Sequence, residues 1–122
     1  MIFKCYVNEV EYILDYGVWC IKANNKLQET NINPLLLDGV VYDIDNDMEP
    51  AIKLSSKELE QFKYHLNARS YYDISMLMDV SLPTVKRRAS IIIEKFNYLA
   101  KTIHELVIIY YKHQLLLAKS SK

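Results

Sequence analysis

The densest cluster of cationic side chains in the sequence is Lys86-Arg87-Arg88, and side chains of this type bind phosphates or the acceptor edge of guanine. The cluster lies inside residues 81–96, which carry apolar residues at helical spacing. At about 100° per residue, one face of this helix gathers the apolar side chains Val85, Ala89, Ile92 and Phe96. Lys86 and Arg87 fall on the opposite face with Ser90, and Arg88 falls at the border. The pattern predicts a helix that holds cations out to solvent, where a polyanion can reach them.

The start of this helix, and of a shorter one before it, can be read from capping residues. A hydroxyl just before a helix accepts a hydrogen bond from a free N–H of the first turn, and Ser70 and Ser81 are placed to do this. Pro83 is tolerated in a first turn, where its missing N–H has no partner within the helix. Two helices of about 8 and 14 residues, joined by a tight turn at 79–80, make a helix-turn-helix. The second of them is narrow enough to enter the major groove of DNA.

Two further helices are predicted around this pair. Ser55 and Glu58 fit a capping box, in which the hydroxyl accepts from the third helical N–H and the carboxylate accepts from the Ser55 amide. The helix behind this box buries one stripe, formed by Leu59, Phe62 and Leu66. A last helix is predicted from Thr102 to Lys119, so residues 54–122 are expected to form a domain of four helices.

Residues 54–96 follow the motif pattern of a known family of DNA-binding domains. The family's leading L-[ST]-x-x-E is matched by Leu54, Ser55 and Glu58. Its run I-A-x-x-L-x-[IV]-S-x-x-T-V-K is followed at Ile74, Ser75, Met78, Val80, Ser81, Thr84, Val85 and Lys86. Its closing I-x-x-K-[LMF] is matched by Ile92, Lys95 and Phe96. On these matches, which need no gap, the segment resembles the LuxR-type (GerE-like) helix-turn-helix family.

The resemblance implies a small bacterial or phage transcriptional regulator that binds double-stranded DNA as a homodimer. Lys86 and Arg87, with Ser90 beside them and Arg88 at the border, are expected at base edges or nearby phosphates. The family's phosphate contacts come from the starts of the second and third helices, which here are Tyr71, Tyr72, Ser81 and Thr84. For Thr84 an alternative role is open, as part of the cap of the third helix.

Several positions depart from the family pattern. Leu82 and Pro83 replace residues that are commonly polar, and Ile91 stands where a polar residue is frequent. These residues favour a rival function, in which the helix-turn-helix is a protein-interaction module that pairs with RNA polymerase or another regulator without reading DNA. Arg88 occupies a position usually held by His, as in region 4 of sigma factors, so a sigma-region-4-like DNA reader is a second rival.

The predicted fourth helix is apolar over more of its circumference than a three-helix core requires, which is typical of an interface. The family resemblance implies dimerisation through this helix. The expected dimer interface consists of Leu106, Val107, Tyr110 and Leu117. The alternative is that the helix packs against residues 1–42 of its own chain, because that segment also needs an apolar partner.

Residues 1–53 are expected to be a separate acidic segment with short strands, ending in a linker at 43–53. This half carries four Lys/Arg and nine Asp/Glu, whereas residues 54–122 carry eleven Lys/Arg and six Asp/Glu, so the net charges are −5 and +5. Residues 23–26 read as a hairpin turn, and 40–42 as a short strand. Residues 9–16 fit either a strand or a short helix. The expected fold is therefore mainly α, with an α/β or β-containing N-terminal segment.

The rest of the sequence predicts no catalytic, metal or cofactor site, and no enzyme is expected. Cys5 and Cys20 match no zinc spacing, so both thiols are expected to be buried and reduced. No Gly-rich phosphate loop or nucleophile motif is present. The longest uncharged apolar run, residues 106–111, is too short to span a bilayer, and no signal peptide is visible. A cytoplasmic protein is expected, without a membrane partner.

Overall fold

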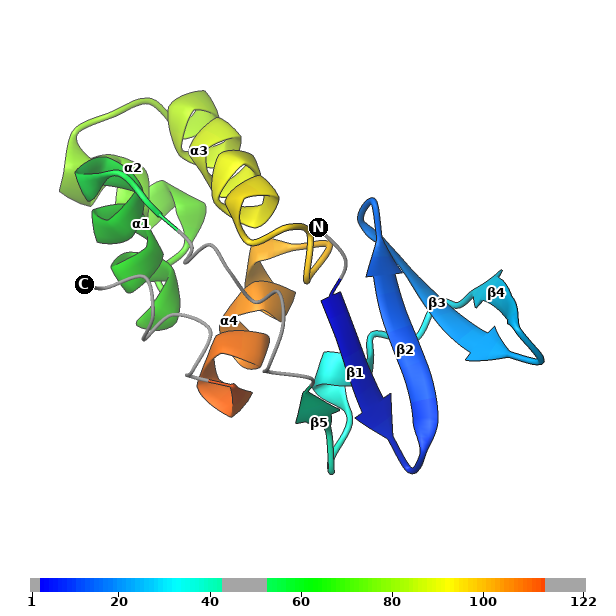
Figure 1. Cartoon of the computed structure of the whole chain (residues 1–122). Coiled ribbons are helices and arrows are strands. Elements are labelled where there is room, and N and C mark those ends of the chain that lie inside the picture. The colour runs from blue at the N-terminus through cyan, green and yellow to red at the C-terminus, as the bar shows by residue number, and fades with distance from the viewer. Residues whose placement is uncertain (1–2, 43–52, 114–122) are drawn as a thin grey trace.

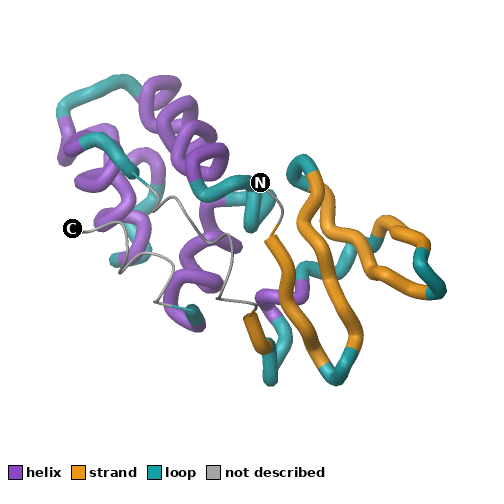
Figure 2. Tube along the Cα trace, in the orientation of Figure 1, coloured by secondary structure: helices purple, strands orange, loops and turns teal. Residues whose placement is uncertain are grey.

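The computed structural model describes residues 3–42 and 53–113, and it places an antiparallel sheet before four helices (Figure 1). The helices gather at one end of the molecule and the sheet at the other (Figure 2). The predicted fold class, four C-terminal helices after a strand-containing segment, is confirmed. Most of the predicted linker at 43–53, and Leu117 of the predicted dimer interface, lie outside the described residues.

The N-terminal segment forms one antiparallel sheet of five strands in the order β4-β3-β2-β1-β5. The strands are β1 (Phe3–Val7), β2 (Val10–Asp15), β3 (Val18–Ala23), β4 (Lys26–Glu29) and β5 (Val41–Tyr42). The stretch that fitted both a strand and a helix is the strand β2, because each of its residues pairs with β1 or β3. The predicted short strand near residue 41 is β5, which pairs with β1.

Two-residue turns join the first four strands, and both residues of each turn have positive φ. The turn residues are Asn8 and Glu9 (50° and 67°), Tyr16 and Gly17 (49° and 82°), and Asn24 and Asn25 (52° and 62°). Turns of this kind match the right-handed twist of the strands that they connect. Asn and Gly adopt positive φ at low cost, so the hairpin predicted at residues 23–26 follows from its two asparagines.

Alternate residues of the sheet turn toward the helices. Cys5 pairs with Tyr12, and Leu14 pairs with Trp19, so these four side chains lie on one face of the sheet. Each of them is at most 7% exposed, and they belong to the same buried cluster as Phe62 of the helical segment. The sheet and the helices therefore share one core, and the boundary at 43–53 separates two kinds of element rather than two cores.

The helices are α1 (Ser56–Leu66), α2 (Tyr71–Met78), α3 (Leu82–Lys95) and α4 (Ile103–Lys112). The capping box is confirmed, because the Glu58 amide donates to Ser55 Oγ at 3.2 Å and the Ser55 amide donates to Glu58 Oε1 at 2.8 Å. Ser70 and Ser81 cap α2 and α3 in the predicted way. Asp79 ends α2 in the left-handed conformation, with φ at 54°. In the described ranges, no helix has the length and apolarity that crossing a membrane requires.

The buried face predicted for α3 is confirmed. Its members, each at most 2% exposed, are Val85, Ala89, Ile92 and Phe96. The Phe96 ring lies 5.4 Å from the ring of Phe62 on α1, which in turn meets Tyr110 of α4 edge-on at 5.7 Å. On α2, Leu77 is 50% exposed, because this short helix packs through Ile74 and Ser75.

The fourth helix packs on its own chain. A short 3-10 helix, η1 (Pro34–Leu36), lies between the sheet and α4, and its Leu35 is fully buried. Just after α4, the Nε2 atom of His113 lies 2.8 Å from the Leu35 carbonyl oxygen. Leu106 and Ile109 are at most 1% exposed in the core that they share with Leu35.

Three residues of the predicted dimer interface lie on the described part of α4. Leu106 is buried within one chain, and Val107 and Tyr110 are partly buried against the same core. The segment before residue 43, which is the alternative packing partner predicted for this helix, packs against its buried face. Leu106 is therefore not available to a second chain in this fold. The apolar residues that α4 leaves most exposed are Ile108 and Tyr111, at 39% and 53%.

Candidate nucleic-acid interface

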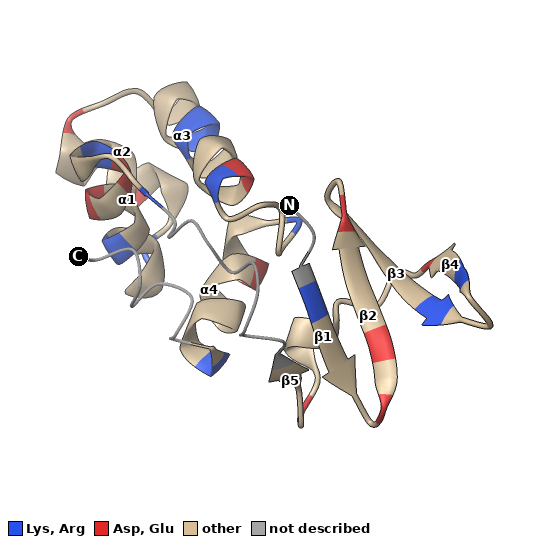
Figure 3. Cartoon of the chain, viewed as in Figure 1, with Lys and Arg blue, Asp and Glu red and all other residues tan. Residues whose placement is uncertain are grey.

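The outer face of α3 carries the predicted DNA-contacting residues. Lys86, Arg87 and Ser90 are exposed, because the opposite face of the helix is held in the core. The basic band in the middle of α3 can be followed in Figure 3. The Ser90 hydroxyl donates to the Lys86 carbonyl oxygen at 3.3 Å, so it lies directly beside the cations. These three residues form a polar surface that a phosphate or a base edge can reach.

Arg88 is placed differently from the two cations before it. It is half-buried, and its Nη1 atom lies 3.5 Å from Gln61 Oε1 on α1, the outer limit of a hydrogen bond. Gln61 itself is fully buried, and its amide nitrogen donates to the Val85 carbonyl oxygen at 2.9 Å. Arg88 therefore faces α1 at the border of the core, and Gln61 links α1 to the backbone of α3.

A buried histidine completes this contact beneath α3. The Gln61 amide nitrogen lies 3.2 Å from His65 Nε2, and His65 is 6% exposed. Burial lowers the pKa of His65 to about 4, so its ring is neutral at pH 7 and can accept this hydrogen bond. Sequence reasoning missed the network, although a Gln next to Phe62 on the inner stripe of a helix was a signal for it.

Thr84 and Ser81 act together at the start of α3. The Thr84 amide donates to Ser81 Oγ at 3.3 Å, and the two hydroxyl oxygens lie 2.8 Å apart. Both oxygens belong to the cap, and they remain at an exposed helix start where phosphates bind favourably. The geometry supports the capping role of Thr84 directly, and it places the residue where a phosphate contact is also feasible.

The two tyrosines at the start of α2 have different surroundings. Tyr71 is partly buried and meets the His65 ring edge-on, with ring centres 5.7 Å apart. Tyr72 is 65% exposed and has its hydroxyl free to reach a ligand. Tyr72 is thus the better placed of the two for a phosphate contact. Next to it on α2, Met76 is 67% exposed, so this helix also offers an apolar surface that the sequence patterns did not predict.

One ion pair fixes the far end of α3. Lys95 Nζ lies 2.6 Å from Glu58 Oε1 at the start of α1. Burial alone would raise the pKa of Glu58, but hydrogen bonds from Lys95 and from the Ser55 amide outweigh it and lower the pKa. Lys95 is therefore held in an ion pair within the fold. Lys86 and Arg87 are the cations of α3 that remain available to contact a ligand.

The described residues contain no group of three or more His, Cys, Asp or Glu side chains arranged to hold a metal ion. Cys5 and Cys20 are both buried and free. Burial raises the pKa of Cys5 to about 12. The pKa of Cys20 is raised by burial and by the nearby carboxylates of Asp15 and Glu29. Both thiols are protonated at pH 7 and thus poor nucleophiles.

No family model, curated protein or solved structure matches the chain. Support for a function comes therefore from the outer face of α3 and its surroundings. Of the residues predicted from the sequence, the structure exposes Lys86, Arg87 and Ser90 together on that face. It places Ser81 and Thr84 one turn earlier, at the cap, and directs Arg88 toward α1.

Proposed function

We propose that the chain is a transcriptional regulator that binds double-stranded DNA through α3. The observation that carries the proposal is the pairing of Lys86 and Arg87 on the exposed face of a helix whose other face is locked into the core. A helix held in this way keeps its side chains at fixed positions, as recognition in the major groove requires. The motif resemblance of residues 54–96 to LuxR-type domains supports the same function.

The residues divide into two roles under this proposal. Lys86 and Arg87 meet guanine edges or nearby phosphates, and Ser90 lies within reach of the same groove. The hydroxyls of Tyr72 and Thr84 hold backbone phosphates, which position the helix without reading sequence. Arg88 takes a supporting role, because it lies against Gln61.

The packing of α4 limits the surfaces that a second copy could contact. A homodimer built on Leu106 would have to expose a side chain that is now 1% exposed, so pairing would need another surface. The exposed side of α4 with Ile108 and Tyr111 is the surface that we propose for a second copy. Sedimentation of the wild type and of an Ile108→Asp variant tests this: a wild type that stays monomeric at high concentration limits the proposal to one chain per site.

The experiment that tests DNA binding is a titration of a random duplex, followed by fluorescence anisotropy over a series of salt concentrations. Each phosphate neutralised by a cation contributes a slope of about −0.9 to the plot of log K against log salt. We expect clear binding at low salt that weakens steeply as salt is added. Absence of binding at low salt, with the protein folded, would contradict the proposal.

A second candidate function is favoured by the apolar surface of α2. Tyr72, Met76 and Leu77 are 65%, 67% and 50% exposed, which suits a contact with another regulator or an RNA polymerase subunit. Pro83 is exposed close by in the chain, at the start of α3. A Met76→Ser variant separates the two functions without changing the net charge, since it would weaken partner binding but leave the affinity for random DNA unchanged.

A sigma-region-4-like mode of DNA reading remains a variant of the first proposal, because it would use the same face of α3. Such a mode predicts that Arg88 reads DNA. In the structure Arg88 lies against Gln61, so Arg88→Ala should lower DNA affinity less than Arg87→Ala does. Equal losses in the two variants would favour the sigma-like mode.

A further inference from the structure

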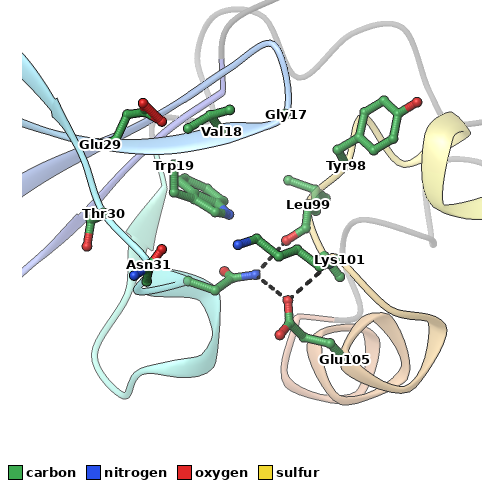
Figure 4. A pocket seen from close by; sticks show the side chains of 12 residues that line it. Gly17, Val18, Trp19, Glu29, Thr30, Asn31, Tyr98, Leu99, Lys101 and Glu105 are labelled. Atoms are coloured by element: carbon green, nitrogen blue, oxygen red, sulfur yellow. Dashed lines mark hydrogen bonds between the residues drawn. The ribbon is translucent and has the colours of Figure 1, made fainter.

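A pocket of about 200 Å³ lies where the sheet meets the linker between α3 and α4 (Figure 4). Its walls come from the start of β3, the end of β4, the residues before η1, the linker at 98–101 and the first turn of α4. These segments are far apart in sequence, so the pocket exists only when the sheet and the helices are packed together. The DNA-contacting face of α3 is not part of it.

One side of the pocket is apolar and fixed. Trp19 and Leu99 are 6% and 3% exposed, whereas Tyr98 is 47% exposed at the rim. The hairpin turn before β3 packs directly on Tyr98: a Cβ atom added to Gly17 would lie 3.3 Å from the Tyr98 side chain. Gly17 also has a φ of +82°, so both its backbone and its lack of a side chain serve this contact.

The other side of the pocket is polar and charged. The Asn33 amide nitrogen donates to the Leu99 carbonyl oxygen at 2.7 Å and to Glu105 Oε1 at 3.0 Å. The Lys101 amide donates to the same Glu105 oxygen at 3.2 Å. These bonds hold the Glu105 carboxylate at the pocket and use only one of its two oxygens, so the other remains an acceptor.

A cation also lines the pocket. Lys101 is exposed, and Figure 4 shows its side chain extending from the linker toward the Trp19 ring. In the described part of the chain the two ion pairs are Lys95–Glu58 and Lys112–Asp38, so Lys101 and Glu105 are not paired with each other. The pocket therefore presents one positive and one negative group next to an aromatic wall.

We propose that this pocket binds a small zwitterion of the size of a free amino acid. The Lys101 ammonium takes the ligand's carboxylate, the free Glu105 oxygen takes its ammonium, and an apolar side chain lies against Trp19. A simple anion would meet the carboxylates of Glu105 and Glu29, and a simple cation would meet Lys101. The volume is below the range of about 300–1,000 Å³ that drug-sized ligands occupy, which also favours a ligand of this size.

Binding would tie the sheet to the linker that follows α3. The proposal does not depend on DNA binding, since every group in it lies outside the basic face of α3. A ligand that binds only the assembled pocket raises the stability of the folded chain by mass action. It would also offer a route by which a metabolite could act on the position of α3.

The test uses the full chain and its only tryptophan, Trp19, as the reporter. Leucine and phenylalanine are titrated while Trp19 fluorescence and, in parallel, heat of binding are recorded. For each amino acid the matched amine without the carboxylate and the matched acid without the amine are titrated as well. We expect saturable binding of at least one of the two amino acids, and at least about tenfold weaker binding of its two matched analogues, because each lacks one charged contact.

Two variants sharpen the result. Lys101→Ala removes an exposed side chain and should weaken amino-acid binding by about tenfold, whereas Lys57→Ala, an exposed lysine at the start of α1, should leave it unchanged. Circular dichroism verifies that both variants are folded. Equal binding of the amine and the amino acid would overturn the zwitterion proposal. No saturable signal with either amino acid, in fluorescence or in calorimetry, would overturn the pocket as a ligand site.

Discussion

Helices α3 and α4 both carry apolar residues in abundance, and the fold uses them in different ways. α3 buries one face, with Val85 and Ile92 fully enclosed, and leaves its cations in solvent. α4 buries Leu106 and Ile109 in the core that joins it to η1 and the sheet. The first helix is free to act on a ligand, whereas the second holds the two halves of the chain together. A helix that is apolar over most of its circumference therefore indicates a dimer interface only when no other part of its own chain packs against it.

The largest expected effect comes from a charge at the buried face of α4. Leu106→Asp leaves a carboxylate without a partner in the core, so we expect a loss of about 3–5 kcal/mol of unfolding free energy, enough to unfold a marginally stable chain. Lys86→Ala on α3 should change that free energy by less than about 0.5 kcal/mol. Urea unfolding compares the two. A folded Leu106→Asp variant that only loses self-association would instead place Leu106 at a dimer interface.

The next effect is a pH dependence beneath α3. The pKa of His65 is about 4 in the folded chain and 6.5 as its ordinary value, so the unfolded chain binds the proton first as pH falls. The stability that the neutral ring provides is present above pH 6.5 and is lost progressively between about pH 6.5 and 4. The loss is on the order of 3 kcal/mol. Urea unfolding at several pH values measures it.

The control for this pH dependence is the exposed histidine of α4. His65→Leu should remove most of the loss between pH 6.5 and 5, whereas His104→Gln should retain it. The contribution of Glu58 to stability is also lost in acid, because its pKa is lowered in the folded chain. That loss sets in around and below its ordinary pKa of 4.5, at lower pH than the loss from His65. An unchanged pH profile in His65→Leu would contradict the assignment.

Smaller effects are expected at the two helix caps. Ser81 caps α3, and Thr102 caps α4 by accepting from the Glu105 amide at 3.0 Å. Replacing either by Ala should cost about 1 kcal/mol of stability, measured by thermal unfolding. Only Ser81→Ala should also weaken DNA binding, because only the start of α3 lies at the proposed interface. Equal losses of DNA affinity in both variants would indicate a general effect of unfolding.

The smallest effect is expected for Thr84→Val. Its hydroxyl lies 2.8 Å from the Ser81 hydroxyl, so its loss should lower stability by about 0.5 kcal/mol. If Thr84 also holds a phosphate, the affinities for a selected operator and for random DNA fall by the same factor. Measuring both affinities beside the melting temperature decides between the roles: a change in melting temperature alone would leave Thr84 with the cap only.

The helical half could be read from the sequence because its signals are local. The hydroxyls of Ser55, Ser70 and Ser81 and the apolar spacing of α3 fixed three helix starts and one buried face within a few residues of each cap. β2 could not be decided in the same way, because Val10, Ile13 and Leu14 fit a helical face as well as a strand. Pairing with β1 and β3 decides it, and pairing is not visible in a single segment.

The missed contacts between the sheet segment and α4, and between α1 and α3, join distant parts of the chain. Asn33 and Glu105 are 72 residues apart, and Gln61 and Val85 are 24 apart. No periodic pattern links the two members of either pair, so only the folded chain brings them together. The cover on Leu106 has the same origin, because Leu35 reaches α4 through η1. Local capping and spacing therefore predicted the helices, whereas contacts between distant segments determined which side of α4 is buried.

The central claim, that the outer face of α3 binds DNA, is tested most directly by reversing charge on two helices. Lys86→Glu with Arg87→Glu alters α3, and Lys57→Glu with Lys63→Glu alters the exposed side of α1 with the same change in net charge. Anisotropy with a random duplex at low salt compares both double variants with the wild type. We expect the α3 variant to lose at least about a hundredfold in affinity and the α1 variant to lose less than about tenfold. Equal losses in the two variants, or none in the α3 variant, would contradict the claim.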